Sequence, residues 1–494
     1  MKIQNRQIIK NTPFSIIDIG SFSIRLVVYD SLSVAARTLF NEKVICNLGK
    51  VVAVNSKIEG KELKFMLDVL DRFVSISKSM NSQTPTFLAT SAIRISQNRL
   101  QIEKIIKDRF DANLKILSEE SEGKFAALGI LYSHKNVTGI VGDLGGGSLE
   151  LTCVNGDIDF LGSLKLGYAF LENIGEPFSY SVNDHIVKSL KKIKNHEYRN
   201  FYAVGGSFRV IARLYMFLKK INLKVVQDFS ISSQNIKNIL KKNLVTKNKK
   251  INTDLLLNIT KSRRNSLPYA LNVLEHMISF FNVKDVYFSS SSIREGYINS
   301  LIKGSNNDAF LFQIQRLADQ TMTSSMANGL FKWLKDVSST FNISDDILMS
   351  ACWISNIAWD VHPEHRRMYA MERVLWYPFY RISREERIEL ALTMYFRHSN
   401  AIKNKLAEKY LSQIDGNTKI RCRFIGQCLR LAHHITGGIS SKNLDTCYLR
   451  LKKDNLKLHV IGKNSIFYGE AIPRGLKNAA NAIGIYKTEI KFNN

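Results

Sequence analysis

Residues 140–151 read Ile-Val-Gly-Asp-Leu-Gly-Gly-Gly-Ser-Leu-Glu-Leu, and this stretch predicts two strands joined by a glycine turn. An apolar run from Val137 predicts the first strand, and residues 149–151 predict the return strand. The glycines at 145–147 have no Cβ and permit positive φ, so their backbone N–H groups can converge on an anion, usually a phosphate. A glycine-rich hairpin without a ligand is the alternative for this stretch taken alone.

Polar side chains flank this turn on both sides. Asp143 ends the first strand, where its carboxylate is placed to hold a divalent cation that bridges phosphate oxygens. Because successive strand residues point to opposite faces, Ser148 and Glu150 share one face and Leu149 and Leu151 the other. A hydroxyl and a second carboxylate are therefore expected to face the same anion.

The same pattern occurs about 125 residues earlier. Residues 14–21 read Phe-Ser-Ile-Ile-Asp-Ile-Gly-Ser, an apolar strand that ends in Asp18, Gly20 and Ser21, and a second strand follows over residues 24–29. Two copies of strand–Asp-x-Gly–strand at domain-length spacing indicate an internal duplication. We expect two similar α/β lobes, each of which contributes one wall of a phosphate site.

Charged residues near two further segments are candidates for the chemistry. Residues 86–94 predict a strand that runs into a helix, with Arg94 in the first helical turn. Arg94 is either a surface charge or a bidentate phosphate ligand. Three glutamates, Glu119, Glu120 and Glu122, begin the next helix, where they complement its dipole. One of the three would serve as a general base if it faces the site.

A third glycine turn and a basic run follow. The strand at 201–204 leads into Gly205, Gly206 and Ser207 and then a helix, which is another anion cradle. Residues 235–264 contain nine Lys and Arg against a single acid. This run is either a solvated helical face or a means of gathering a polyanion.

Domain boundaries follow from the change in pattern along the chain. We expect an N-terminal lobe over residues 1–134, a second lobe over 135–304, and a mostly helical domain over 305–494, after a linker near residues 303–307. The helical part contains the His-Pro-Glu-His run at 362–365 and the His pair at 433–434, which show no recognisable ligand spacing. Structural or surface histidines are favoured there over a metal site.

Composition limits the class of protein. The chain has 494 residues and a formal net charge of +27, an excess that attracts a polyanion such as nucleic acid, polyphosphate or a highly phosphorylated nucleotide. A general compositional bias is the alternative. The six cysteines are scattered and form no C-x-x-C pair, which fits a reducing cytoplasm. The sequence contains no run of 18 apolar residues, so no membrane-spanning segment is predicted. We expect a cytoplasmic protein without a membrane partner.

Six motifs together resemble the exopolyphosphatase/guanosine pentaphosphatase (Ppx/GppA) family of the sugar kinase–actin–Hsp70 superfold. The motifs occur in the family's order over residues 12–303: 18–21, 89–94, 118–124, 143–150, 205–207 and 293–296. The resemblance implies two actin-like (ribonuclease H-like) α/β lobes and an HD-like helical C-terminal domain. The chain departs from the family at Phe22 (usually Asn), Ser121 (usually Glu) and Ser207 (usually Thr).

The resemblance also implies roles for residues. Glu122 matches the catalytic glutamate, Arg94 the phosphate-binding arginine, and Asp143 and Glu150 the acids that hold Mg²⁺ and position water. The remaining matches are phosphate-binding positions: Asp18, Gly20, Ser21, Gly145, Gly146, Gly147, Ser148, Gly205, Gly206 and Ser207.

The expected function is hydrolysis of the terminal phosphoanhydride of inorganic polyphosphate by metal-assisted attack of water. Two alternatives stay open: removal of the 5′-phosphate of pppGpp, and non-catalytic binding of polyphosphate or an alarmone. A sugar kinase is disfavoured because no sugar-binding insert precedes Asp143. The resemblance also implies a homodimer, and nucleic acid is not expected as a partner.

Overall fold

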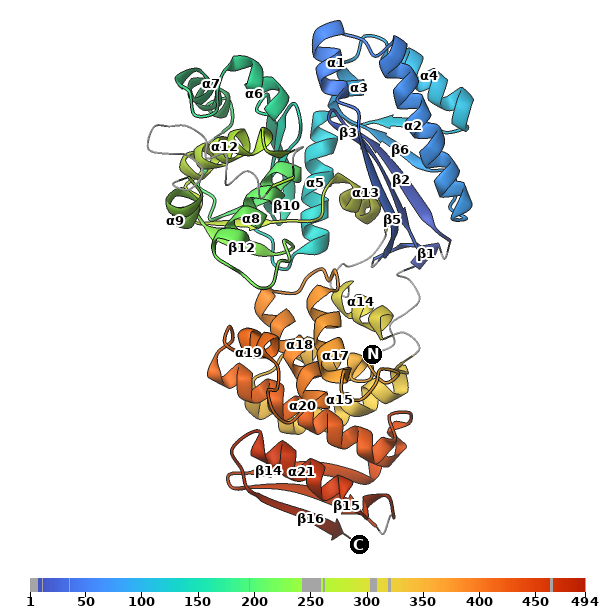
Figure 1. The fold of residues 1–494 in the computed structure, drawn as a ribbon, viewed down its shortest axis with the longest axis vertical. Coiled ribbons are helices and arrows are strands. Elements are labelled where there is room, and N and C mark those ends of the chain that lie inside the picture. The colour runs from blue at the N-terminus through green and yellow to red at the C-terminus, as the bar shows by residue number, and fades with distance from the viewer. Residues whose placement is uncertain are drawn as a thin grey trace. The chain divides into compact units, whose positions relative to one another are not determined.

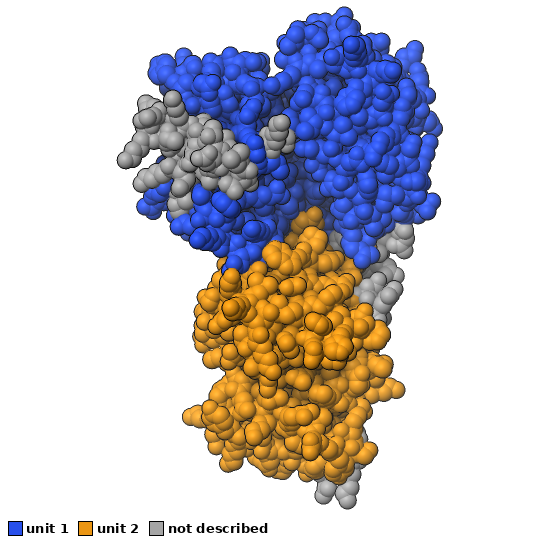
Figure 2. All heavy atoms as spheres, in the orientation of Figure 1, with its two compact units in different colours: residues 1–307 blue, residues 308–494 orange. Residues whose placement is uncertain are grey.

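The computed structural model describes residues 8–10, 12–34, 36–194, 196–241, 259–260, 263–302, 309–318, 321–462 and 465–493. Most of the basic run at 235–264 and the linker predicted at 303–307 lie outside these residues. The chain forms two compact units, unit 1 over residues 1–307 and unit 2 over residues 308–494 (Figures 1 and 2). No helix in the described part of the chain has the length and apolar character needed to cross a membrane.

Unit 1 contains two sheets with the same core topology, which confirms the predicted duplication (Figure 1). The strand order is β5-β3-β2-β6-β7 in the first sheet and β10-β9-β8-β11-β13-β12 in the second. In each sheet three strands form an antiparallel meander, β2-β3-β5 in the first sheet and β8-β9-β10 in the second. Two parallel strands extend each sheet on the other side of the meander's first strand: β6 and then β7 beside β2, and β11 and then β13 beside β8. The strands of the first sheet are β2 (Phe14–Ile19), β3 (Ser23–Tyr29), β5 (Thr38–Ile45), β6 (Thr86–Ala89) and β7 (Leu114–Ile116). Those of the second are β8 (Gly139–Leu144), β9 (Leu149–Asn155), β10 (Asp157–Leu164), β11 (Asn200–Val204), β12 (Phe229–Ser232) and β13 (Asp285–Phe288). A small pair, β1 (Ile8–Lys10) and β4 (Leu32–Ser33), accompanies the first sheet.

The central strands carry nearly continuous apolar sequence because both of their faces are covered. Every residue of β8 is buried, and so are all but the last of β9. Strands covered on both faces lose the alternation of apolar and polar residues that a half-exposed strand shows. The covering helices of unit 1 are α1 (Leu48–Asn55), α2 (Gly60–Ser79), α3 (Ser91–Ile95), α4 (Arg99–Phe110), α5 (Glu119–Ser133), α6 (Tyr168–Ile174), α7 (Tyr180–Leu190), α8 (Gly206–Leu218), α9 (Ser233–Asn235), the π-helical turn Ile236–Lys241, α12 (Ser266–Phe280) and α13 (Ile293–Leu301).

Helix α5 lies on the second sheet although it comes from the first half of unit 1 (Figure 1). Its apolar residues pack with side chains of β8, β9 and β11. Two glycines permit the close approach: a Cβ at Gly123 would lie 2.7 Å from Thr152 Oγ1, and one at Gly129 would lie 2.6 Å from the carbonyl oxygen of Ser292. Helix α13 therefore packs against α5, and the N-terminal turn of α5 is carried onto β9 and β10.

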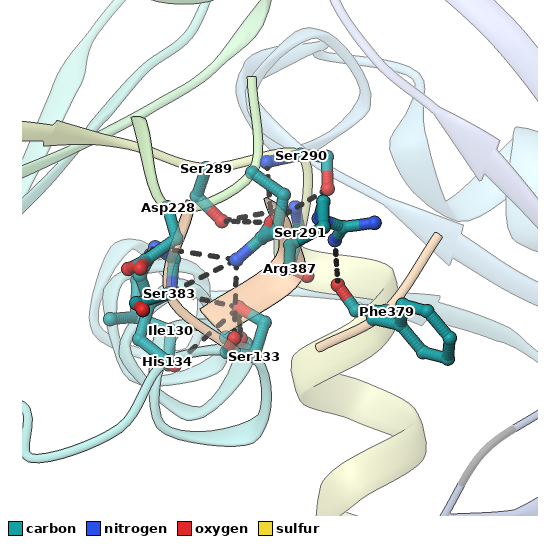
Figure 3. A network of polar contacts seen from close by, with 12 residues as sticks. Ile130, Ser133, His134, Asp228, Ser289, Ser290, Ser291, Phe379, Ser383 and Arg387 are labelled. Atoms are coloured by element: carbon teal, nitrogen blue, oxygen red, sulfur yellow. Dashed lines mark hydrogen bonds and ion pairs between the residues drawn. The ribbon is translucent and has the colours of Figure 1, made fainter. Parts of the chain in front are cut away.

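A polar network ties the far end of α5 to neighbouring loops of unit 1 (Figure 3). The buried His134 lies 3.0 Å from Ser133 Oγ through Nδ1 and 3.8 Å from the Asp228 carboxylate through Nε2. Gln227 accepts hydrogen bonds from the backbone N–H and the hydroxyl of Ser290, at 3.0 and 2.7 Å. These contacts satisfy the buried side chains of Ser133 and His134 and hold the loop after β13 in place.

Unit 2 is mostly helical, as expected, and ends in a small sheet. Its helices are α14 (Ala309–Leu317), α15 (Ser324–Ser338), α16 (Asp345–Ile354), α17 (Arg366–Trp376), α18 (Arg384–His398), α19 (Lys405–Leu411), α20 (Gly416–Thr436) and α21 (Ala471–Asn481), with short 3₁₀ turns at Ser339–Phe341, Ser441–Thr446 and Ser465–Phe467. The sheet has the order β14-β15-β16, with β14 (Cys447–Lys452), β15 (Asn455–Ile461) and β16 (Lys487–Asn493). Ser383 and Glu386 form a capping box at the start of α18, and Arg387 donates to the carbonyl of Phe379 (Figure 3).

Candidate active site

The hairpin β8–β9 brings two acids together. Asp143 and Glu150 are directly opposed in the antiparallel register, so their side chains leave the same face of the sheet. Glu150 accepts a hydrogen bond from Ser163 on β10 at 3.1 Å, and the nearby Ser148 hydroxyl opposes the rise in its pKa. Both carboxylates are buried, at 8% and 3% exposure.

Arg94 and Glu122 meet from different segments of the first half of the unit. Arg94 lies in α3, whose N-cap position is Thr90, and Glu122 lies in the first turn of α5, whose N-cap Ser118 accepts from the backbone N–H of Ser121. The Arg94 guanidinium donates to Glu122 Oε1 and, at 2.6 Å, to the carbonyl oxygen of Leu117. Arg94 is thus no surface charge: it holds the buried Glu122.

Burial raises the pKa of all three acids. The pKa of Asp143 rises to about 6, mainly through desolvation and against the positive charge of Arg209. The pKa of Glu122 rises to about 7 through desolvation, which outweighs the opposing effect of Arg94. The pKa of Glu150 rises to about 8 through desolvation and the negative charge of Glu122. Three buried carboxylates with raised pKa values are typical of a functional site.

The two duplicated turns face each other. A Cβ at Gly146 would lie 3.5 Å from Ser21 Cβ, and one at Gly147 would lie 3.6 Å from Ser91 Oγ. The expected use of positive φ is wrong for this turn, because none of the residues 145–147 has a positive φ. Their lack of side chains matters for space instead, because any side chain longer than Cβ would fill the gap between the two turns.

Asp18 forms an ion pair with Arg294 that joins the early strand β2 to the late helix α13 of unit 1. Its Oδ2 accepts from Arg294 Nη1 at 2.8 Å, across 276 positions of sequence. Nearby acids, Glu295 first among them, raise the pKa of Arg294 against its desolvation. Asp18, predicted among the phosphate-binding positions, therefore holds α13 against β2, and Gly20 and Ser21 form the turn beside it.

The Gly205 turn adjoins Asp143. Gly205 has φ 112°, and a Cβ there would lie 2.5 Å from the carbonyl oxygen of Leu144 and 3.3 Å from Asp143 Oδ1. Arg209, one turn into α8, donates to the carbonyl of Ser290 at 3.1 Å. Burial and, after it, the charge of Arg294 lower the pKa of Arg209 to about 10. The turn thus brings a cation to the same acids.

Arg263 covers the start of α8. Its Nη1 lies 3.4 Å from Ser207 Oγ, and a Cβ at Gly206 would lie 2.5 Å from its Nη2. The guanidinium stacks 5.0 Å from the ring of Phe22, and Lys43 lies 5.3 Å from the same ring. The aromatic residue that departs from the family pattern therefore gathers two cations beside Gly206 and Ser207.

The acids fit a divalent cation of the kind that uses substrate oxygens as ligands. Among the described residues no group of three or more His, Cys, Asp or Glu side chains is close enough to enclose a metal ion. Asp143 and Glu150 offer two carboxylates, and Mg²⁺ in phosphate sites is bound by one or two carboxylates, with water and phosphate oxygens completing its shell. The pKa values of both acids are raised mainly by burial, and a bound cation would favour their charged forms.

Sequence reasoning missed the roles of three cations, Arg209, Arg263 and Arg294. Arg294 lies inside the motif at 293–296, and Arg209 lies two residues after the motif at 205–207. A basic residue just after a strand-end turn is the signal that would have found both. Arg263 lies in the basic run, where nothing in the sequence distinguishes it from its neighbours.

Comparisons with known proteins agree with this geometry. The model of the Ppx/GppA phosphatase family matches residues 27–304, more than half of the chain, and the model of the exopolyphosphatase C-terminal domain matches residues 324–490. No curated protein matches the chain.

Solved structures share the fold of unit 1. A Ppx/GppA family member from Aquifex aeolicus is 20% identical with a TM-score of 0.51, and the match covers 60% of this chain and 99% of that one. An exopolyphosphatase from Cytophaga hutchinsonii is 18% identical with a TM-score of 0.51, over 59% of this chain and 98% of that one. At these identities the likeness shows the fold alone, which confirms the expected pair of actin-like lobes.

Proposed function

Because the chain belongs to the Ppx/GppA phosphatase family, we propose that unit 1 is an exopolyphosphatase, which hydrolyses the terminal phosphoanhydride of inorganic polyphosphate. The observation that supports this proposal is the convergence of Glu122, Asp143 and Glu150 beside a glycine turn. Such a site suits in-line phosphoryl transfer, which needs positioning and charge stabilisation more than covalent chemistry.

Each residue has a part in this mechanism. Water attacks the terminal phosphorus and a new P–O bond forms while the bridging P–O bond breaks; the water proton goes to Glu122 and the shortened chain leaves as an anion. A pKa of about 7 suits a general base at neutral pH. The backbone N–H groups of residues 146–148 would donate to the phosphate oxygens, whereas that of Gly145 already donates to the carbonyl of Ser148, and Arg94 orients Glu122. Asp143 and Glu150 would hold Mg²⁺, which supplies charge neutralisation on those oxygens.

The test is phosphate release, in Mg²⁺, from long-chain polyphosphate and from pppGpp in parallel. Glu122→Gln should lower the rate by about 10²–10⁴-fold, the usual effect of removing a general base. Glu120→Gln is the matched control, because Glu120 lies on the same helix but is exposed and paired with Lys124. Near wild-type turnover of Glu122→Gln would exclude this residue as the base.

The comparison of the two substrates, long-chain polyphosphate and pppGpp, distinguishes the proposed function from its alternatives. Release from long polyphosphate that depends on Glu122 supports the proposal, and release from pppGpp alone would assign the site to the alarmone. Binding of either substrate without release would leave a non-catalytic binding protein.

A further inference from the structure

Three side chains join helix α1, from the first half of unit 1, to helix α6, from the second half, and the proposed chemistry uses none of them (Figure 1). Lys50 Nζ on α1 lies 2.9 Å from Glu172 Oε2 on α6 and 5.6 Å from the centre of the Tyr168 ring. The Tyr168 hydroxyl donates to the other carboxylate oxygen of Glu172. We refer to Lys50, Tyr168 and Glu172 as the α1–α6 contact.

Helix α1 is attached to the turn after β2. The backbone N–H of Gly49 donates to the carbonyl oxygen of Ser21 at 2.8 Å, and two further backbone bonds, at 3.1 and 3.0 Å, join the residues before α1 to the carbonyl of Phe22. A Cβ at Gly49 would lie 2.8 Å from Ser21 Cβ, well inside the distance of about 3.5–4.0 Å at which carbon atoms pack. The start of α1 and the turn therefore move together, and Lys50 is the next residue of the helix.

Helix α6 is attached to the glycine turn after β8 in a similar way. The backbone N–H of Gly167 donates to the carbonyl of Gly147 at 3.1 Å. The N–H of Ala169 donates to the carbonyl of Gly146 at 2.9 Å. A Cβ at Gly167 would lie 2.4 Å from the carbonyl oxygen of Gly146, so the start of α6 lies directly on the turn. Glu172 follows within the same short helix.

Tyr168 and Glu172 are held in place by the second half of the unit. The Tyr168 ring lies 5.5 Å from the ring of Tyr269 on α12, whose hydroxyl donates at 2.9 Å to the carbonyl of Gly175 at the end of α6. Burial and the bond to Glu172 raise the pKa of Tyr168 to about 12. Against desolvation, the hydrogen bonds from Tyr168 and Lys50 lower the pKa of Glu172. Glu172 is therefore an anion at neutral pH, and Lys50 is the member of the contact that reaches it from the first half.

We propose that Lys50 is a positioning residue, which holds the turns at 20–22 and 145–147 at the separation that the terminal phosphate group of the substrate needs. The two turns face each other, with Gly146 beside Ser21, and each is bonded to one of the helices that the α1–α6 contact joins. Breaking the contact allows α1 and α6 to separate, and the turns separate with them. The inference rests on the proposed function, because it assigns both turns to the phosphate group.

The size of the expected effect follows from the exposure of the contact. The side chains of Lys50 and Glu172 are 55% and 36% exposed, and an ion pair or a cation–π contact of this kind changes an equilibrium by about a few-fold. Bound substrate itself favours the arrangement in which both turns contact it, so saturating substrate compensates for the lost contact. Loss of the contact should therefore raise KM about three- to ten-fold and leave kcat within about two-fold.

Steady-state phosphate release from polyphosphate by Glu172→Gln, in Mg²⁺, tests the proposal. This variant removes a negative charge, so long-range attraction of a polyanion would by itself lower KM. The proposal predicts the opposite, a KM about three- to ten-fold higher at an unchanged kcat. A lower or unchanged KM would overturn the proposal. A lower kcat at an unchanged KM would also overturn it, because that result indicates a loss of folded enzyme.

Two further variants separate the contact from its charge. Asp184→Asn is the matched control: the Asp184 side chain is also 36% exposed, and it pairs with Lys188 at 2.7 Å within α7. It makes the same change in charge away from α1, so KM should stay within about two-fold. The double variant Lys50→Gln/Glu172→Gln should raise KM no further than the worse single variant, because each change breaks the same contact. A double variant whose KM effect equals the product of the two single effects would contradict the proposal.

Hydrogen exchange without substrate tests the contact independently of activity. In Glu172→Gln, peptides that cover residues 19–24 and 145–149 should exchange at least about three-fold faster, and a peptide over residues 180–190 should not change. These peptides report the two turns whether or not the chain releases phosphate from polyphosphate or pppGpp, so a failure of this inference is distinct from a failure of the proposed function. Unchanged exchange at both turns would overturn the inference.

Discussion

Gly123 allows the close approach of α5 to the second sheet and so sets the position of Glu122, the proposed general base. The variant Gly123→Ala measures how strongly activity depends on this close approach. In a helix interior, alanine is more favourable than glycine by about 1 kcal/mol. Here the new Cβ would lie 2.7 Å from Thr152 Oγ1 and 2.8 Å from Phe160 Cδ2, distances that force a shift. Overpacking of this kind costs about 1–3 kcal/mol, so we expect a net destabilisation of about 0–2 kcal/mol.

The effect on catalysis should exceed the effect on stability. A shift of α5 moves Glu122, which directly precedes Gly123. A misplacement of about 1 Å in a catalytic group typically costs 10²-fold in rate. We expect kcat to fall about ten-fold with little change in KM, measured by phosphate release from polyphosphate. Urea unfolding followed by circular dichroism gives the stability. Gly416→Ala is the control, because a Cβ there meets nothing within 4 Å, and it should change neither quantity adversely. Full activity of Gly123→Ala would refute the claim that this contact positions the base.

Two further predictions concern charge. Glu150→Gln should change how stability depends on pH in buffer without divalent cations. The pKa of Glu150 is raised from 4.5 to about 8, so the folded chain holds an extra proton across that window and the free energy of unfolding falls as the pH rises through it, by about 1.4 kcal/mol per unit. The variant should lose this decline; parallel stability curves for the two proteins would contradict the assignment. Arg294→Gln should cost about 2–3 kcal/mol, because it leaves Asp18 without its partner in a site that is only partly exposed. Adding Asp18→Asn should restore part of that loss, and strictly additive effects in the double-mutant cycle would show that the pair is not coupled.

The local sequence determined the elements around the site. Asp18 and Asp143 each end an apolar strand before a glycine turn, and this short-range pattern predicted both turns and the duplication. The direct pairing of Asp143 with Glu150 came from the strand register in the structure. It succeeded because strand alternation and glycine chemistry act over a few residues. The family resemblance added the choice of Glu122, which the residues alone had left open among three glutamates.

Tertiary structure decided which of those side chains meet. Glu122 is buried against Arg94 while Glu120 pairs with Lys124 at the surface, a distinction that depends on how α5 packs on the second sheet. Asp18 pairs with Arg294, which lies 276 residues further along the chain. Periodicity reports which face of an element is buried, but the partner across that face is fixed by packing between segments that are distant in sequence.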